Sequence, residues 1–271
     1  MTTKLAKEIR AEAWNALGEK GQYWTFAVGE LVLAIAVTVP IVLLCIAAVM
    51  VFIATGAAPY FQQGGHPDIG LFTDPAIMLP ILSFALAASI VIIYPIGFMA
   101  WGNAAMSIAT MRKGLKFGHA FSGWGHGWKM GWIVMVKYTY ITLWSLLLWI
   151  PGIVKALSYA MTEFIAVDHP DWNATQCITE SRRLMDGHKW RLFCLMVSFI
   201  GWLVLLMFAT LVAAVVLPMA ANLLKYFFMP YIESAKAAFY EDLLDRAETA
   251  PAAGSGEVTD YVGLIDRNAV V

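Results

Sequence analysis

The sequence predicts an all-α protein, a polytopic bundle of about six membrane-crossing helices with amphipathic helices at the membrane surface. One observation is composition, because 60% of the residues are hydrophobic and 14% are charged, against roughly 45–50% and about 25% in soluble domains. The other is that residues 31–67, 75–111 and 192–224 contain no Asp, Glu, Lys or Arg. Each run exceeds the ~20 residues that a membrane-spanning helix requires.

We expect residues 1–22 to form an amphipathic cytoplasmic helix. Its apolar face consists of Leu5, Ala6, Ile9, Ala13, Ala16 and Leu17, and its polar face carries Lys4, Lys7, Arg10 and Glu12. Such a helix either lies in the headgroup plane of the membrane or packs on the protein's own cytoplasmic loops. The residues leave both arrangements open.

The membrane domain is expected over residues 23–246. Its first span is 31–55, and its second runs over about 76–98, with the apolar remainder to Met111 bending along the surface. A third span over 132–150 should reverse at Pro151-Gly152, because proline lacks the N–H that a continuing helix needs. Residues 152–167 then return as a short fourth span.

The charge-free run after Arg191 would be ~50 Å long as one helix, so it should hold a fifth span and the start of a sixth. We expect the break near Pro218 and the sixth span over 219–240. The remaining residues, 247–271, begin with a stretch rich in Ala, Gly, Ser and Pro, which predicts a flexible cytoplasmic tail.

Residues 174–186 have the pattern of a helix that lies along the membrane surface. Asp171 or Asn173 can cap its beginning, and Gly187 can close it. The apolar face is Ala174, Cys177, Ile178, Ser181, Leu184 and Met185. The basic residues expected at the interface, facing lipid headgroups or a partner, are Arg182, Arg183, His188, Lys189 and Arg191.

Short motifs in the second half resemble a known family. They are Tyr159-Ala-Met-Thr162, Glu180-Ser181, Leu184-Met185, Gly187-His188-Lys189-Trp190, Leu192-Phe193, Ser198-Phe-Ile-Gly-Trp202, Pro230-Tyr231, Ala235 and Ala238-Phe-Tyr240. In these the chain is similar to a group of bacterial integral-membrane proteins, domain-of-unknown-function family 975. The resemblance implies a multi-pass protein of the bacterial cell membrane and carries over no catalytic residue. One departure is Glu163, where the family pattern has a proline.

Basic residues predict the orientation, since loops rich in Lys and Arg stay in the cytoplasm. Residues 1–22, 112–129 and 169–191 hold four Lys or Arg each, whereas residues 56–74 hold none. Both basic loops can be cytoplasmic only if two spans separate them. This predicts six spans in the cell (inner) membrane, with both termini in the cytoplasm.

Several charges fall inside the predicted spans, where an unpaired charge is costly. Counting residues from Pro151 and Pro218 places Lys137, Glu163 and Glu233 at similar depths. We therefore predict that Lys137 pairs with Glu163 and that Glu233 and Lys236 lie close by. Tyr159 could complete this intramembrane polar cluster. The cluster is either a structural lock between helices or a cytoplasm-facing site for a substrate or a proton.

Two function classes remain. The favoured one is non-enzymatic: a transporter, or the membrane subunit of a transport or envelope complex. The alternative is a membrane enzyme that acts on a lipid at the cytoplasmic interface, but we find no nucleophile beside a base and no paired carboxylates there. We expect no catalytic residues and no cofactor. His119 and His126 form too weak a pattern for a metal site.

Expected partners are membrane lipid and either another protein or a second copy of the chain. The net charge of −1 argues against a nucleic-acid partner, which would require a clustered basic surface.

Overall fold

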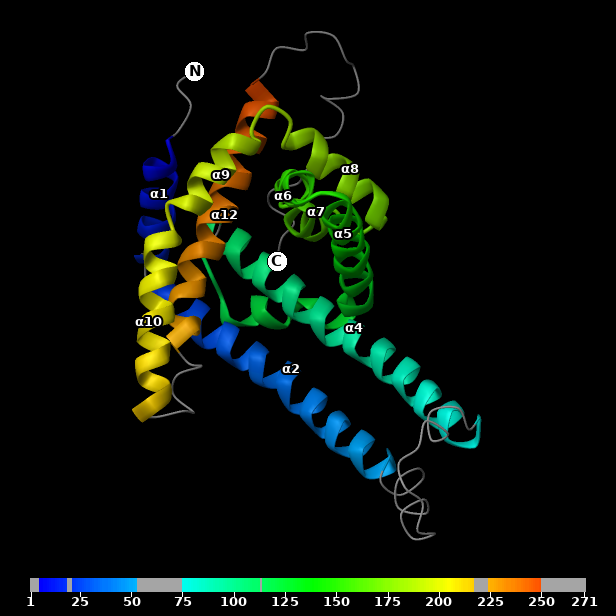
Figure 1. The fold of residues 1–271 in the computed structure, drawn as a ribbon. Helices are drawn as coiled ribbons and strands as arrows, with labels where there is room; N and C mark the ends of the chain where they lie inside the picture. The colour runs from blue at the N-terminus through cyan, green and yellow to red at the C-terminus, as the bar shows by residue number, and fades with distance from the viewer. Residues whose placement is uncertain (1–4, 19–20, 53–74, 113, 217–223, 250–271) are drawn as a thin grey trace.

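The structure is a computed structural model that describes residues 5–18, 21–52, 75–112, 114–216 and 224–249 (Figure 1). All regular structure in these residues is helical. Four segments among them are long and apolar enough to cross a membrane: Gln22–Ala47, Gly127–Leu147, Ile150–Asp168 and Lys189–Leu211. The predicted fold class, a helical bundle with several candidate spans, is confirmed. The count of six spans stays a prediction. The residues after Thr249, which make up most of the predicted tail, lie outside the described residues.

The described elements follow one another along the chain. They are α1 Ala6–Gly18, α2 Gln22–Phe52, α4 Pro75–Arg112, the 3-10 helix η4 Phe117–Gly125, α5 Gly127–Leu147, α6 Trp149–Ser158, α7 Thr162–Asp168, α8 Ala174–Leu184, α9 Lys189–Val197, α10 Ile200–Val216 and α12 Leu224–Thr249.

The second predicted span is longer than expected, because α4 continues without a break for 38 residues. The expectation that residues 99–111 bend along the surface was therefore wrong. These residues instead bury Trp101, Ala105 and Ile108 in the main core, where α4 packs against α5, α7 and α12. The hydroxyl groups of Ser107 and Thr110 donate hydrogen bonds to backbone carbonyls one turn earlier, so burial leaves neither of them unbonded.

Glycines let α4 and α5 approach at backbone distance. A β-carbon on Gly97 would lie 2.0 Å from the carbonyl oxygen of Gly127, and one on Gly131 would lie 2.3 Å from that of Ile93. Gly127 and Gly131 are four residues apart on α5, the spacing of small residues that membrane helices use for close packing. This crossing fixes the base of the hairpin that carries Lys137.

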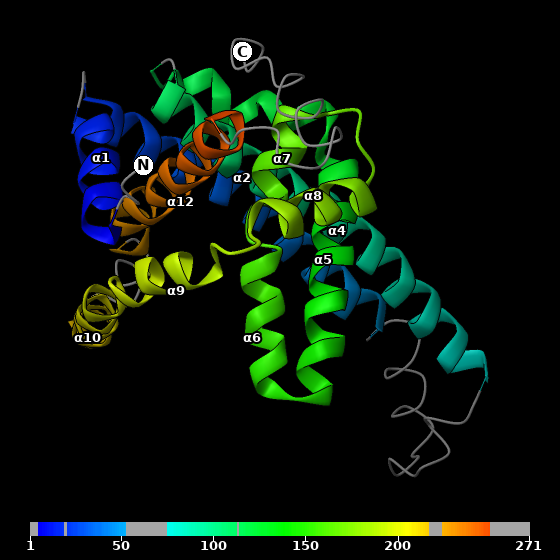
Figure 2. The same ribbon diagram turned by 90° about the horizontal axis from the view of Figure 1, so that it is seen from above.

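α5 and α6 form an antiparallel hairpin that projects from the rest of the bundle (Figure 2). The predicted reversal is confirmed, but it lies at Leu148, whose backbone is extended (φ −160°, ψ 140°), and not at Pro151-Gly152. Pro151 instead occupies the first turn of α6, where a missing N–H costs nothing. Gly152 is needed for close contact, since a β-carbon there would lie 2.2 Å from the Ser145 Oγ.

The returning segment is interrupted by a turn at residues 159–161, between α6 and α7. Backbone groups freed by this turn bond to Ser181 of α8. The Met161 N–H donates to the Ser181 Oγ at 3.2 Å, and that hydroxyl donates to the carbonyl oxygen of Ser158 at 2.9 Å. An irregular turn inside a membrane protein requires such internal partners. Two motifs of the family resemblance, 159–162 and 180–181, therefore meet at one place.

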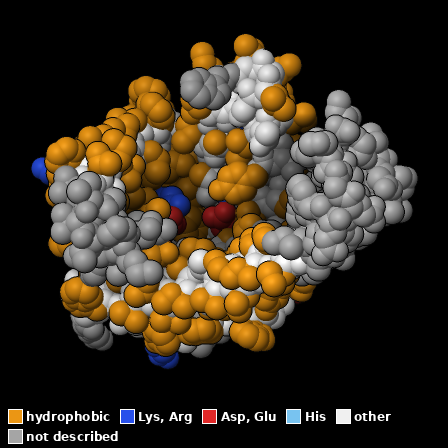
Figure 3. Space-filling view, turned by 60° about the horizontal axis from the view of Figure 1, so that its bottom comes forward, with side chains coloured by type: hydrophobic (Ala, Val, Ile, Leu, Met, Phe, Trp, Pro, Cys, Tyr) orange, Lys and Arg blue, Asp and Glu red, His pale blue; other side chains and the backbone are white. Residues whose placement is uncertain are grey.

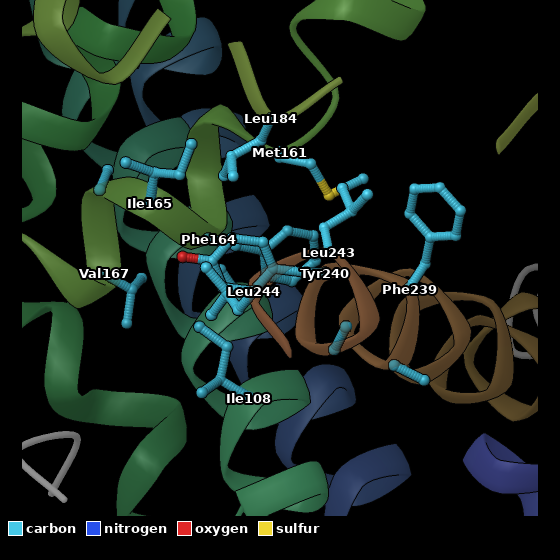
Figure 4. Packing of buried hydrophobic residues seen from close by; sticks show 14 of the residues in the cluster. Ile108, Met161, Phe164, Ile165, Val167, Leu184, Phe239, Tyr240, Leu243 and Leu244 are labelled. Atoms are coloured by element: carbon cyan, nitrogen blue, oxygen red, sulfur yellow. The ribbon is translucent and has the colours of Figure 1, made fainter. Parts of the chain in front are cut away.

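The main core lies where α4, α7, α8 and α12 converge. Figure 4 shows side chains from these helices pointing at one another, with the Phe164 and Tyr240 rings near its middle. The two rings stack with centroids 5.5 Å apart. Leu243 and Leu244 of α12 are almost fully buried there, so α12 stays within the core beyond Tyr240, where we expected its span to end.

α1 packs on the protein itself. Its apolar residues Ile9, Ala13 and Leu17 are buried, and the helix lies against α12 and α9. The Arg10 Nη1 donates a hydrogen bond to the carbonyl oxygen of Ser198 at 3.2 Å. α1 therefore has one of the two arrangements that the sequence left open, since it packs on the protein itself. It packs on helices, whereas we expected it to pack on loops.

α8 has the face that the sequence predicts. Ala174, Cys177, Ile178, Ser181 and Leu184 are buried, against α7 and α5. Asn173 is the capping residue, and its N–H bonds to the Gln176 Oε1 at 2.8 Å. Gly187 follows with a positive φ of 73°, a conformation that glycine adopts without strain.

Candidate functional site

Lys137 and Glu163 form an ion pair within the candidate membrane-crossing segments. The Lys137 Nζ lies 2.6 Å from the Glu163 Oε1, and the ammonium also lies 4.9 Å from the centre of the Tyr138 ring. α5 supplies the lysine and α7 the glutamate, so the pair joins two helices that meet because of the hairpin at Leu148. The pairing predicted from equal depth is present.

A second ion pair lies on α12, where the Lys236 Nζ is 2.7 Å from the Glu233 Oε2. Lys236 also interacts electrostatically with Glu163. The four charges therefore alternate in sign and connect α5, α7 and α12. We call Lys137, Glu163, Glu233 and Lys236 the charged cluster.

Tyr159 does not bond to the charged cluster in the part of the chain that the structure describes. Its side chain is buried, and its ring is 6.4 Å from that of Tyr140. Its hydroxyl makes no hydrogen bond to Glu163 in the part of the chain that the structure describes. Tyr159 is the C-cap of α6 and Glu163 lies in the next helix, α7, so the turn between them separates two residues that one straight helix would place on the same face.

The charged cluster is partly open. The Glu163, Glu233 and Lys236 side chains keep 22%, 20% and 24% of their surface exposed, while Lys137 keeps 8%. Figure 3 shows a hollow with acidic and basic side chains inside it and hydrophobic side chains around it. The arrangement can hold a charged group or exchange a proton, because its carboxylates and ammonium groups are near one another and accessible.

A second ionic network, which we did not predict, joins the ends of three helices. Arg112 at the end of α4 donates two hydrogen bonds of 2.8 Å to the Asp168 carboxylate of α7. It also contacts Glu241 of α12 at 2.5 Å, and the Tyr240 hydroxyl donates to Asp168 at 2.8 Å. The Arg112 and Asp168 side chains are 7% and 1% exposed, whereas Glu241 is 15% exposed, so the Arg112–Asp168 pair is the buried part of this network.

The predicted interfacial basic residues separate into two groups. Arg182 is exposed on α8 and Lys189 is half-buried at the beginning of α9. The other arginines bind carboxylates: Arg183 contacts Glu180 at 2.5 Å, and Arg191 contacts Asp242 of α12 at 2.7 Å. Asp242 also accepts a hydrogen bond from Arg246 at 2.9 Å. Arg191 thus ties α9 to α12, whereas the Arg183 pair lies within α8.

Two pKa values in this region are shifted. Burial alone would raise the pKa of Asp242, but hydrogen bonds from Arg246 and Arg191 outweigh it and lower that pKa. The pKa of His188 is lowered by burial, then by Arg191 and Arg246, with Asp242 and Asp186 opposing them. These surroundings therefore favour the neutral form of His188.

The two histidines considered as metal ligands lie in different surroundings. The His119 Nδ1 accepts a hydrogen bond from the Lys116 N–H at 3.0 Å, whereas His126 stacks on Trp101 with ring centroids 4.3 Å apart. Among the described residues, no three His, Cys, Asp or Glu side chains gather in a group that could hold a metal ion.

No curated protein and no solved structure matches this chain. One family model does match, over residues 77–247, which runs from the beginning of α4 to the last turns of α12 and includes the charged cluster and the network around Arg112. The chain therefore belongs to the family described as Protein of unknown function (DUF975).

Proposed function

We propose that this protein is a non-enzymatic component of the bacterial cell membrane, a transporter or the membrane subunit of a transport or envelope complex. In this proposal the charged cluster binds a small charged solute or carries a proton. The supporting observation is that two ion pairs lie on three helices, one of them between two candidate membrane-crossing segments, and that their side chains remain partly exposed.

The cost of charge inside a membrane supports this reading. A charged side chain at the centre of a spanning helix costs about 2.5–3.5 kcal/mol on the translocon scale. Pairing reduces that cost, but an apolar pair of the same size would often be as stable. Ion pairs are therefore retained in such places either to join helices uniquely or to handle a charged ligand.

The exposure of the side chains favours the handling of a charged ligand as the role of the charged cluster. The Arg112 and Asp168 side chains are nearly sealed, at 7% and 1% exposure, as expected of a lock between helices. The Glu163, Glu233 and Lys236 side chains each keep about a fifth of their surface exposed. An accessible carboxylate can exchange its lysine partner for a cationic group of a solute, and an accessible ammonium can do the same for an anionic group.

The test is mass spectrometry of the full chain purified in native-like lipid. We expect a small charged molecule to be released on denaturation of the wild-type protein and to be lost from the Glu163→Gln variant. Arg182→Gln, which changes an exposed charge outside the cluster, is the matched control and should retain it.

Two outcomes would contradict the proposal. Equal recovery of the molecule from Glu163→Gln and wild type would show that the cluster does not bind it. Release of a lipid cleavage product, formed during incubation with added lipid, would favour the alternative, an enzyme acting on lipid at the interface.

A further inference from the structure

A separate pocket lies where the end of α8, the turn before α9 and the last part of α12 meet. Its volume is about 180 Å³. Four ionisable side chains line it, namely Arg183, Asp186, His188 and Arg246, and Leu184, Leu243 and Ala247 complete the wall. Two guanidinium groups thus line the space with a single carboxylate and an imidazole whose surroundings favour its neutral form, which favours an anionic ligand over a cationic one.

The two arginines are held in place by bonds on the protein side. Arg183 contacts Glu180 at 2.5 Å, and Arg246 bonds to Asp242 at 2.9 Å. A guanidinium carries five N–H donors in a planar fork, so an arginine that binds a carboxylate can also bind a phosphate oxygen. Holding the side chain beforehand reduces the entropy that binding would cost.

The electrostatic field at His188 agrees with an anion site. Burial and the nearby charges of Arg191 and Arg246 lower the pKa of His188, against the opposing effect of Asp242 and Asp186. His188 also stands at the beginning of α9, and the N-terminal end of a helix carries partial positive charge.

The position of the pocket along the chain indicates which kind of anion is near it. The candidate span Lys189–Leu211 begins directly after His188. Trp190, in its first turn, is 72% exposed and stacks with Phe193 at 5.2 Å, as expected of aromatic residues at the membrane interface. Independently of the proposed function, we infer that this pocket binds the phosphate group of an anionic phospholipid at the level of the headgroups.

Native mass spectrometry of the full chain in detergent tests this inference. The probes are short-chain phosphatidic acid, the diacylglycerol with the same chains, and inorganic phosphate. We expect phosphatidic acid to bind with 1:1 stoichiometry and diacylglycerol not to bind. Arg183→Gln should weaken the binding about fivefold, since one arginine near a charged membrane surface contributes about 1 kcal/mol.

Two further variants distinguish loss of the binding site from misfolding of the protein. Asp186→Asn removes the one carboxylate from the lining and should strengthen binding, a gain that misfolding cannot produce. Arg182→Gln changes the neighbouring exposed arginine, which does not line the pocket, and should leave binding unchanged.

The outcomes are distinct. Equal weakening by Arg182→Gln and Arg183→Gln, or equal binding of diacylglycerol and phosphatidic acid, would overturn the inference. If inorganic phosphate bound as tightly as the lipid, the pocket would still be a phosphate site. The inference that the phosphate belongs to a lipid would then be overturned.

Discussion

The Lys137 Nζ lies 2.6 Å from the Glu163 Oε1, across the interface between α5 and α7. Both residues belong to segments that are apolar enough to cross a membrane, so each would lose its direct ion-pair partner without the other. The pair is therefore expected to be coupled energetically, whatever further role the charged cluster has.

Replacing either partner should destabilise the protein, because the remaining charge loses its counter-ion. We expect Lys137→Ala and Glu163→Ala each to cost about 2 kcal/mol, less than the ~3–5 kcal/mol of a fully buried pair because Glu163 is partly exposed. The double variant should recover about 1 kcal/mol of the summed loss. Unfolding in detergent measures all three, and strictly additive losses would show that the two side chains do not interact in solution.

The crossing of α4 and α5 should tolerate no added atom at Gly97. A β-carbon there would overlap the Gly127 carbonyl oxygen at 2.0 Å, so Gly97→Ala must move one backbone and should cost about 3 kcal/mol or more. Gly201→Ala on α10 is the control, since no atom lies within 4 Å of its β-carbon position. Thermal unfolding should show a large loss for the first variant and a small gain for the second.

Much of the arrangement around Lys137 could be predicted because it depends on distances along one chain. A reversal near Pro151 and a fixed rise per residue bring two charges on neighbouring helices to the same depth. An error of three residues in the turn, Leu148 for Pro151, did not change the partners. In contrast, hydropathy alone could not show that α4 continues to Arg112, because the extra turns are buried by other helices that are distant in sequence.

The network around Arg112 was not predicted from the sequence. Asp168 and Glu241 are the first charges after the predicted spans 152–167 and 219–240, and Arg112 is the first charge after the charge-free run 75–111. That shared position was a usable signal for their meeting. The sequence could not supply the lateral order of helices in the bundle, on which the contacts among α4, α7 and α12 depend.

The buried face of α8 predicts the effect of charge at neighbouring positions. Ile178 is buried, whereas Thr179 is exposed. Ile178→Glu should cost about 3 kcal/mol, because it places a carboxylate against α5 and α7. Thr179→Glu adds the same group on the outer face and should change stability by less than about 0.5 kcal/mol. Similar losses for both, measured by thermal unfolding, would mean that α8 does not pack as described.

Stability should fall on mild acidification. Burial lowers the pKa of His119, His169 and His188 below the ordinary value of 6.5, with nearby cations adding to the effect at His119 and His188. The unfolded chain then binds more protons than the folded one below pH ~6.5. The stability that comes from keeping these histidines neutral is fully present above that pH. It is lost as the pH falls through their lowered pKa values.

We therefore expect a lower melting temperature at pH 5.5 than at pH 7.5. A variant with all three histidines changed to glutamine should show a smaller difference between the two pH values. A melting temperature that rises on acidification, or an unchanged slope in the triple variant, would contradict the assignment.

The orientation in the membrane follows from combining charge with contacts. Residues 112–129 and 169–191 hold four Lys or Arg each, and residues 56–74 hold none. Contacts place the two basic segments at the same end of the bundle, because Lys129 bonds to the Pro170 carbonyl oxygen and Arg112 bonds to Asp168. Since basic loops stay in the cytoplasm, both segments should be cytoplasmic and residues 56–74 should be outside.

Labelling with a membrane-impermeant maleimide tests this orientation in a variant whose native cysteines, Cys45, Cys177 and Cys194, are replaced. Gln176→Cys places a thiol at an exposed position of α8, and Gly65→Cys places one in the loop outside the described residues. We expect Gly65→Cys to react in intact cells and Gln176→Cys to react only after permeabilisation. The reverse pattern would invert the orientation, and it would place the pocket beside Arg183 and His188 on the outer side, since these residues lie in the same basic segment as residue 176.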